Sequence, residues 1–212
     1  VEQAAVRSAL VVRRIYGEKS IGHLGTLDPF ATGLLILLIG RVTRLGNFLD
    51  LEPKVYEATI RFGSEMDTDD ATGRVTRTAP LPKNDDVRAA LLSFTGTFSQ
   101  LPPAYSAKSV DGTRAYDAAR RGEPLKLEPV EVTVHDWGVR ELTDDSLRAV
   151  ITCSGGTYIR GLARDLGRLT SSAAHLAALR RTRIGSFDLK EAVRLEDLND
   201  RPPRLRQLRV VA

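Results

Sequence analysis

An aspartate that precedes a proline is the residue of this sequence best placed to carry out chemistry. Asp28 and Pro29 lie in a stretch of loop composition, residues 22–33, which leads into the continuous apolar run 34–39. The proline favours extended backbone at Asp28, and a buried strand after the loop would hold the carboxylate at the end of a sheet. With His23 in the same loop, the carboxylate could act as a nucleophile or a general base. The alternative is a structural Asx turn before the proline.

A second candidate is a row of arginines that follows a glycine turn. An alternating stretch ends at Cys153, a glycine pair breaks it, and a helix is expected over residues 157–169. Three arginines recur at every fourth position of this helix and share one of its faces: Arg160, Arg164 and Arg168. They form either a solvated stripe or a set of paired charges. Because an arginine in the first helical turn opposes the helix dipole, Arg160 needs an acidic partner, and a buried Asp28 would be one.

Tyrosines form a third set of candidates. Tyr56 lies in an alternating segment, residues 56–62, which predicts a strand. In that strand it could be a core or cross-strand aromatic residue, or a platform on which a nucleobase stacks. The same two interpretations apply to Tyr105, Tyr116 and Tyr158.

Several common kinds of site are not indicated by the sequence. The three histidines lie far apart and there is a single cysteine, so neither a zinc site nor an intrachain disulfide is expected. No glycine-rich phosphate-binding motif occurs, which argues against nucleotide hydrolysis and dinucleotide cofactors. The acidic run 67–73 looks like a calcium loop, but Ala71 and Thr72 stand where a ligand and a glycine are required. The sequence therefore predicts a site without a metal.

The composition is that of a globular protein with one sizeable core. The chain has 212 residues, 42% of them hydrophobic, and its longest apolar run is far shorter than the roughly 20 residues that span a bilayer. Its single Cys153, in a strand that reads as buried, fits a reducing compartment, so a cytoplasmic protein is expected. The net charge of +4 permits a nucleic-acid partner. Basic residues gather within 13–19, 160–183 and 201–209, as solvated faces or as phosphate contacts.

The hydrophobic patterns predict a mixed architecture. Helices are expected over residues 6–14, 85–94 with Asn84 or Asp85 as its cap, 115–121, 157–169 and 172–181. Strands are expected over residues 34–39, buried on both faces, and over 56–62 with 74–78 as its hairpin partner, 130–139, 147–153 and 184–189. The irregular stretch 100–129 has the length of a functional insert. Without a strict βαβ alternation, this order favours an α+β fold with a central mixed sheet.

One segment closely resembles the catalytic motif of a known enzyme family. Residues 23–35, HLGTLDPFATGLL, resemble the motif G-[TA]-L-D-P-x-A-x-G-x-L of TruB-type pseudouridine synthases. The resemblance continues in order through KVYEA at 54–58, the run 67–73, PPAYSA at 102–107, GGTYIR at 155–160 and residues 174–181. It therefore covers nearly the whole chain.

The resemblance implies a fold and a reaction. It implies the pseudouridine synthase catalytic fold, which is α+β with a central mixed, mostly antiparallel sheet flanked by helices and loops. The family isomerises uridine 55 in the T loop of tRNA to pseudouridine without a cofactor. The glycosidic carbon must be reached outside the base stack, so the nucleotide is flipped into the enzyme.

The resemblance also implies roles for individual residues. Asp28 would be the catalytic carboxylate, Arg160 would pair with it, and Tyr56 would stack on the base and take part in proton transfer. Whether Asp28 attacks the sugar or removes a proton from it stays open. Substrate or RNA contacts are assigned to five further residues: His23, which would fill the space vacated by the flipped base, Tyr158 and Leu179, which would line the pocket, and Arg180 and Arg181.

The same comparison suggests how the chain is organised. Residues 1–212 are expected to form one catalytic domain, with an insert at about 99–129 and a basic tail at about 199–212. The family's first strand is not found before Val1, a full C-terminal RNA-binding domain is not recognised, and Ser109 stands where lysine is common.

The expected partner is the T-arm stem-loop of tRNA, with no membrane association, no obligatory protein partner and a monomeric state. Two other functions stay open. One is a non-catalytic RNA-binding protein, motivated by the arginine groups. The other is a phosphohydrolase with an aspartate nucleophile in the acidic run 67–70.

Overall fold

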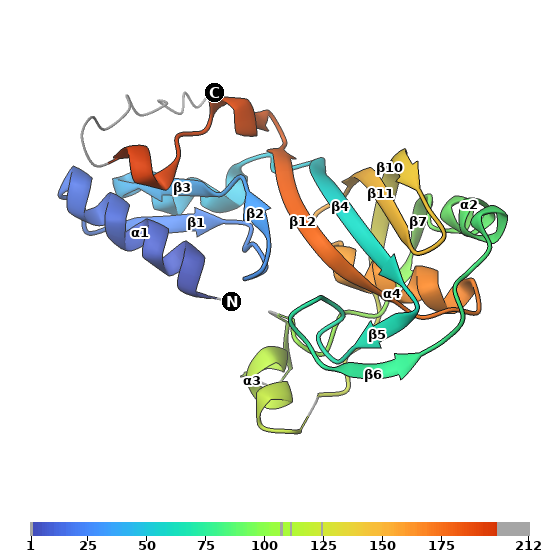
Figure 1. Cartoon of the computed structure of the whole chain (residues 1–212). Helices are drawn as coiled ribbons and strands as arrows, with labels where there is room; N and C mark the ends of the chain where they lie inside the picture. The colour runs from blue at the N-terminus through green and yellow to red at the C-terminus, as the bar shows by residue number, and fades with distance from the viewer. Residues whose placement is uncertain (1, 107, 111, 124, 199–212) are drawn as a thin grey trace.

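A central sheet and four helices make up most of the molecule (Figure 1). The computed structural model describes residues 2–106, 108–110, 112–123 and 125–198. The helices are α1 Glu2–Tyr16, α2 Asn84–Ser93, α3 Ala115–Arg120 and α4 Ile159–Leu169, with 3-10 segments η1 Gly40–Phe48, η2 Leu189–Glu191 and η3 Leu195–Leu198. The strands are β1 Ile21–Leu24, β2 Thr32–Gly33, β3 Ile36–Ile39, β4 Lys54–Phe62, β5 Ser64–Met66, β6 Val75–Thr78, β7 Gly96–Gln100, β8 Ser109–Val110, β9 Thr113–Arg114, β10 Val130–Leu142, β11 Ser146–Cys153, β12 Ala174–Ile184 and β13 Phe187–Asp188.

The central sheet has seven strands and is antiparallel along its main path. Its strand order is β13-β12-β4-β11-β10-β7, and the short β2 pairs in parallel with β12. This arrangement confirms the expected α+β fold with a mixed, mostly antiparallel sheet. None of the helices in the described part of the chain has the length and apolarity of a membrane span.

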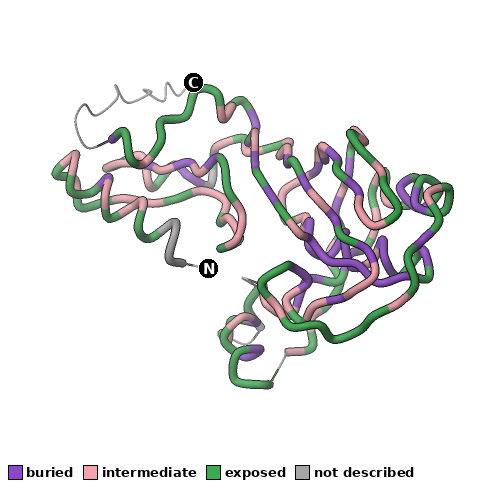
Figure 2. Tube along the Cα trace, in the orientation of Figure 1, coloured by how far each residue is buried: buried purple, intermediate pink, exposed green. Residues whose placement is uncertain are grey.

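The core lies between the sheet and helix α4. Strands β4 and β11 alternate in burial along their length, as strands covered on one face do. Ile60 of β4 and Leu147 of β11 are fully buried together with Leu162 and Leu166 of α4. Each such side chain contributes about 1.5–3 kcal/mol on burial. Figure 2 shows this buried region along the sheet and α4.

Strand β12 is the main departure from the expected elements, because a helix is predicted there. Its alanines, leucines and arginines favour a helix locally, but the segment pairs with β4 from Ala174 opposite Phe62 to Ile184 opposite Lys54. Register shifts between Leu176 and Ala178 and beyond Arg181 interrupt the alternation that marks a strand in sequence. The strand expected over 184–189 is correspondingly reduced to β13.

The apolar run 34–39 forms a strand outside the central sheet. Strand β3 pairs with β1 in a separate two-stranded sheet, and its residues alternate between buried and half-buried, so the expectation of burial on both faces is wrong. Leu34, Ile36 and Leu38 form a second small core with Ile184. His23 lies in β1 and not in the loop, which is therefore shorter than expected.

Two smaller expectations are also wrong. Strand β6 pairs with β5 and not with the strand over 56–62. Helix α2 has Lys83 at its N-cap position without a side-chain cap hydrogen bond, and the Asn84 Oδ1 atom is buried with no hydrogen-bond partner among the described residues. The helices over 6–14 and 115–121 and the strands over 130–139 and 147–153 are confirmed. The basic tail with its arginines lies outside the described residues.

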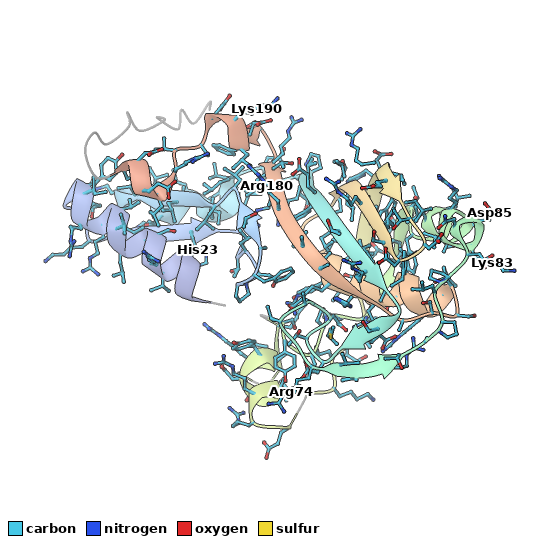
Figure 3. The ribbon with its side chains drawn as sticks, viewed as in Figure 1. His23, Arg74, Lys83, Asp85, Arg180 and Lys190 are labelled. Carbon is cyan, nitrogen blue, oxygen red and sulfur yellow. The ribbon has the colours of Figure 1, made fainter. Side chains whose placement is uncertain are left out.

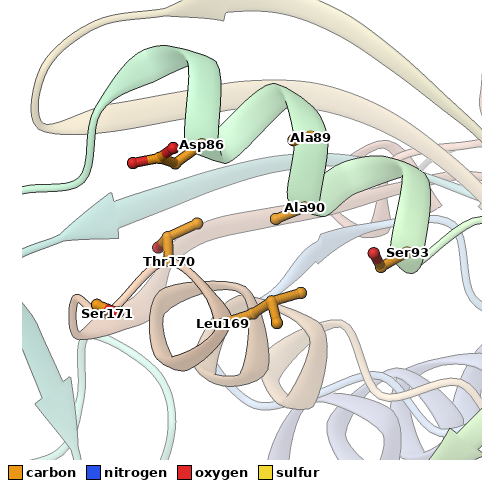
Figure 4. A pocket seen from close by; sticks show the side chains of 7 residues that line it. All are labelled: Asp86, Ala89, Ala90, Ser93, Leu169, Thr170 and Ser171. Atoms are coloured by element: carbon orange, nitrogen blue, oxygen red, sulfur yellow. The ribbon is translucent and has the colours of Figure 1, made fainter.

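A pocket of about 470 Å³ lies between α2 and the C-terminal end of α4 (Figure 4). Its lining is Asp86, Ala89, Ala90, Ser93, Leu169, Thr170 and Ser171. None of these residues is a candidate for chemistry from the sequence.

Substitution of Gly167 tests how closely α4 must approach the sheet. A β-carbon there would lie 2.5 Å from the Ala174 backbone nitrogen, so Gly167→Ala forces α4 away from β12. The overpacking cost of about 1–3 kcal/mol or more should exceed the roughly 1 kcal/mol that alanine gains in a helix. We expect a lower melting temperature for Gly167→Ala in thermal unfolding. Gly138→Ala in β10 is the control, because its β-carbon meets only ordinary contacts from 3.5 Å outward, and it should be neutral. Equal stability of both variants would contradict the close approach.

Candidate active site

A bidentate ion pair between Asp28 and Arg160 forms the centre of the site. The Arg160 Nε donates to Asp28 Oδ2 at 2.8 Å, and its Nη2 donates to Oδ1 at 2.9 Å. The arginine side chain is only 4% exposed, whereas the Asp28 side chain is 25% exposed. The carboxylate is therefore fixed in orientation on its buried side and remains reachable from solvent.

The same guanidinium holds two further segments of the chain. Its Nη1 donates to the Thr68 carbonyl at 2.9 Å, and its Nη2 donates to the Tyr105 carbonyl at 2.9 Å. The Asp70 carboxylate lies 3.7 Å from Nη1 and is itself held by the Thr72 backbone and hydroxyl. The acidic turn and the start of the insert are thereby joined to the loop of Asp28 through one side chain.

The arginine row of α4 is a set of paired charges, and the solvated-stripe alternative is wrong for its first two members. Arg164 donates to Asp69 and Asp165 and to the Leu101 carbonyl, each at 2.8–2.9 Å. Arg168, which is more exposed, pairs with the buried Glu65 at 2.8 Å. No sequence pattern indicated a role for Glu65, and Asp69 was considered only as part of the acidic run 67–70.

The environment shifts the pKa values of two carboxyls in opposite directions. Burial raises the pKa of Asp69 to about 6, although the charge of Arg164 opposes the shift. Hydrogen bonds from Arg168 lower the pKa of Glu65 to about 2, despite its burial, and Arg77 adds to the effect. Glu65 is therefore firmly ionised at neutral pH, while Asp69 titrates in the mildly acidic range.

Arg181 anchors the loop of Asp28 to the sheet. It is 1% exposed, and its guanidinium donates to the Leu34 carbonyl at 2.9 Å and to the Gly25 carbonyl at 2.8 Å. A β-carbon at Gly33, where φ is +103°, would lie 2.2 Å from the Arg181 carbonyl oxygen. Only glycine fits there, and this close approach brings β2 into the sheet beside β12.

Tyr56 lies opposite Arg181 in the neighbouring strand. Its side chain is buried, and burial raises its pKa to about 12. The charge of Arg181 opposes this rise in pKa, whereas the Asp28 carboxylate adds to it. The phenol is consequently protonated at neutral pH in the electrostatic neighbourhood of the carboxylate.

The remaining candidates differ in their burial. Tyr158 is half-buried just before α4, burial raises its pKa, and Gln100 binds both its backbone N–H and its carbonyl. Leu179 is buried opposite Ala58. His23 and Arg180 are exposed, on the side of the molecule that carries α1 and β1 (Figure 3).

The structure thus brings together residues that are far apart in the chain. Asp28, Arg160, Tyr56 and Arg181 meet at one end of the central sheet, and Gln100 is a positioning residue that no motif indicated. Within the described residues, no group of three histidine, cysteine, aspartate or glutamate side chains could hold a metal ion. The arrangement offers an oriented, partly exposed carboxylate beside a protonated phenol and buried apolar side chains. It can perform nucleophilic or acid–base chemistry on a group brought to Asp28.

The fold matches that of chains in two solved complexes. A crystal structure of a Cbf5-Nop10-Gar1 complex superposes with a TM-score of 0.65 at 23% identity, covering 87% of this chain and 46% of that chain. The archaeal box H/ACA sRNP Nop10-Cbf5 complex also gives 0.65 at 24% identity, covering 92% and 49%. These similarities establish the class of fold.

The family follows from the sequence comparisons. Residues 13–159 match the TruB family pseudouridylate synthase N-terminal domain, and residues 160–207 match the tRNA pseudouridylate synthase B C-terminal domain. This chain belongs to the TruB family of pseudouridylate synthases. The boundary between the two matched regions falls inside α4, so Asp28 and its partner Arg160 come from different sides of it.

Several curated relatives carry the name tRNA pseudouridine synthase B. Those of Thermobifida fusca and Aromatoleum aromaticum are each 46% identical, over 88% and 96% of this chain, and that of Rhodopseudomonas palustris is 42% identical over 93%. The chain spans 67%, 65% and 55% of the length of these three relatives.

The lowered pKa of Glu65 predicts an acid-dependent loss of stability. Its ionised form favours folding above its ordinary pKa of 4.5, and the benefit disappears as the pH falls toward 2. We expect Glu65→Gln to lower the melting temperature at pH 7. The difference in melting temperature from the wild type should shrink to zero as the pH falls from 4.5 to 2. Thermal unfolding across this range measures it. Glu141→Gln, in the exposed pair with Arg148, should show almost no gap. A gap for Glu65→Gln that does not vary with pH would count against the ion pairs.

Proposed function

We propose that this protein isomerises uridine 55 in the T loop of tRNA to pseudouridine, with Asp28 as the catalytic carboxylate and without a cofactor. The observation that carries the proposal is the Asp28 carboxylate, which a buried arginine orients and which stays 25% exposed. The names of the relatives, at up to 46% identity, support the same reaction and substrate.

The reaction places demands on the site that these residues can meet. The bond between C1′ of the ribose and N1 of uracil breaks, the base turns, and a bond forms between C1′ and C5. The proton on C5 is then lost and N1 gains one, so atoms and charge balance with no added reagent. Asp28 either attacks the sugar or removes a proton from it. Arg160 balances the charge of the carboxylate and fixes its orientation toward the bound nucleotide.

Other residues would hold the nucleotide. Tyr56 supplies an aromatic platform for the flipped base and a protonated phenol for proton transfer. Tyr158 and Leu179 line the pocket, and the exposed His23 and Arg180 contact RNA on the side of α1 and β1. Arg181 acts through the loop that it anchors, because its guanidinium donates to loop carbonyls.

We further propose a single catalytic domain that works as a monomer in the cytoplasm, on the T arm of tRNA and without an obligatory protein partner. The sheet supports one domain, since β12 from the second matched region pairs with β4 from the first. The buried Cys153 thiol, whose pKa is raised to about 12 by burial, fits a reducing compartment.

The acidic turn does not favour the alternative function of a phosphohydrolase. Its carboxylates Asp69 and Asp70 face the guanidinium groups of Arg164 and Arg160.

The decisive test is the reaction of a T-arm stem-loop with wild type, Asp28→Asn and Asp28→Ala. We expect product from the wild type only, because both variants lack the ionised carboxylate, while stem-loop binding remains close to that of the wild type. Tritium release from uracil C5 and RNA binding in a filter assay are the two measurements. Asp85→Asn on the exposed start of α2 serves as the control and should retain full activity (Figure 3).

Two results would overturn the proposal. Product formation by Asp28→Asn or Asp28→Ala would remove Asp28 from the chemistry. Binding by the wild type without product, at an affinity indifferent to the target uridine, would instead favour a non-catalytic RNA-binding protein. Thermal unfolding of each variant identifies loss of the fold, since breaking a buried ion pair costs about 3–5 kcal/mol.

A further inference from the structure

A lysine without a partner lies at the edge of the site, where two backbone turns converge. Lys54 begins β4 and is two residues from Tyr56, so both side chains are on the same face of the sheet. A β-carbon at Gly25 of the catalytic loop would lie 3.8 Å from the Lys54 Nζ, and one at Gly155 would lie 3.5 Å from it. The ammonium therefore sits between the loop that carries Asp28 and the turn that leads to α4.

No carboxylate of the described residues forms an ion pair with this lysine. Among the residues that the structure describes, Lys54 makes no side-chain hydrogen bond and no ion pair. Glu52 is the acidic group on the same edge, and one of its oxygens accepts the Gly155 N–H at 2.9 Å. Burial and the charge of Arg181 both lower the pKa of Lys54, and Cys153 and Glu52 offset only part of this.

Arg181 adds a second positive charge at the same place. Its Nη1 would lie 3.5 Å from a β-carbon at Gly25, and within the described part of the chain it pairs with no carboxylate. Arg160, by contrast, is balanced by Asp28 and Asp70. The site thus has a neutralised pair at its chemical centre and two uncompensated cations beside it. A buried or half-buried cation without a carboxylate partner is costly unless an anion joins it.

We infer that Lys54, with the charge of Arg181 behind it, binds an RNA phosphate that flanks the target nucleotide. The inference rests on the proposed function, because it takes the substrate to be RNA whose target sugar reaches Asp28. The flanking phosphates are attached to that sugar, and Gly25 stands three residues before Asp28, so one of them falls near Lys54. A lysine ammonium is a compact point charge that suits a single phosphate oxygen.

The inference separates two tasks at the site. Lys54 anchors the backbone of the flipped nucleotide, and Asp28 acts on its sugar. Because flipping costs a few kcal/mol, a phosphate contact adjacent to the flipped sugar helps to hold the extruded state. Lys54 is on this view an RNA-binding residue that acts before the chemical step.

The test combines a protein change with a change in the RNA. Lys54→Met keeps the length of the side chain and removes its charge. A methylphosphonate on either side of the target uridine removes the charge of one phosphate. We expect Lys54→Met to weaken stem-loop binding by roughly tenfold and to reduce the slope of log K against log salt by about 0.7. One of the two methylphosphonates should weaken binding by the wild type and have no further effect on Lys54→Met.

The matched control is Lys83→Met, the same charge change on the exposed lysine before α2 (Figure 3). It should bind like the wild type. Thermal unfolding of Lys54→Met should show no loss of stability, because an unpartnered charge is removed. A purely structural role for Lys54 would instead lower the melting temperature without changing the response to the methylphosphonates.

Two outcomes would overturn the inference. One is wild-type binding by Lys54→Met. The other is that each methylphosphonate weakens stem-loop binding equally for the wild type and for Lys54→Met. That result would mean that Lys54 contacts the base or does not contact the RNA. Binding is measured without turnover, and wild-type product formation is scored separately. An error in the proposed reaction is thereby distinguished from an error in the phosphate site.

Discussion

The bidentate pair of Arg160 and Asp28 is the interaction on which the rest of the site depends. A guanidinium that is only 4% exposed must satisfy its donors inside the protein, and it does so with the Asp28 carboxylate and with carbonyls of Thr68 and Tyr105. These groups belong to the loop of Asp28, the acidic turn and the insert. The requirement to satisfy one buried cation therefore specifies how three distant segments meet at the start of α4.

The distribution of charge follows from the same requirement. The three arginines of α4 face four carboxylates besides Asp28, namely Asp69, Asp70, Asp165 and Glu65, so each of these guanidinium groups has at least one carboxylate partner. On the side toward β4 and β12, Arg181 donates to loop carbonyls, and Lys54 forms no ion pair with a carboxylate of the described residues. An anionic polymer would be attracted to the second side and leave the balanced carboxylate free for chemistry.

Strand β12 shows how one element serves both fold and site. Its backbone completes the sheet between β4 and β13, and its Arg181 holds the loop of Asp28 at Gly25 and Leu34. Gly33 allows the loop backbone to reach that strand, where any β-carbon would collide with the Arg181 carbonyl. The position of the carboxylate thus depends on a strand that is distant in sequence, since Leu34 and its hydrogen-bond donor Arg181 are 147 residues apart.

Patterns carried by local sequence were sufficient for part of this structure. The apolar alternation of 56–62 and 147–153, the helix after Gly156 and the α+β order were predicted, since side-chain period and turn residues encode them directly. The helix-dipole argument also predicted correctly that Arg160 has an acidic partner, and the motif around Asp28 identified the family.

Local patterns could not reveal that 174–184 is a strand, because its helix-forming composition and its bulges hide the period that pairing with β4 imposes. Nor could they show that the acidic turn neutralises α4, that Gln100 holds Tyr158, or that Lys54 lies unpaired between two glycines. Residue types and spacing determined the chemistry available to this chain. Burial and pairing across the folded sheet decided which charged side chains have a partner and which remain open to a ligand. The reason is that desolvation and side-chain contacts exist only once distant segments are brought together.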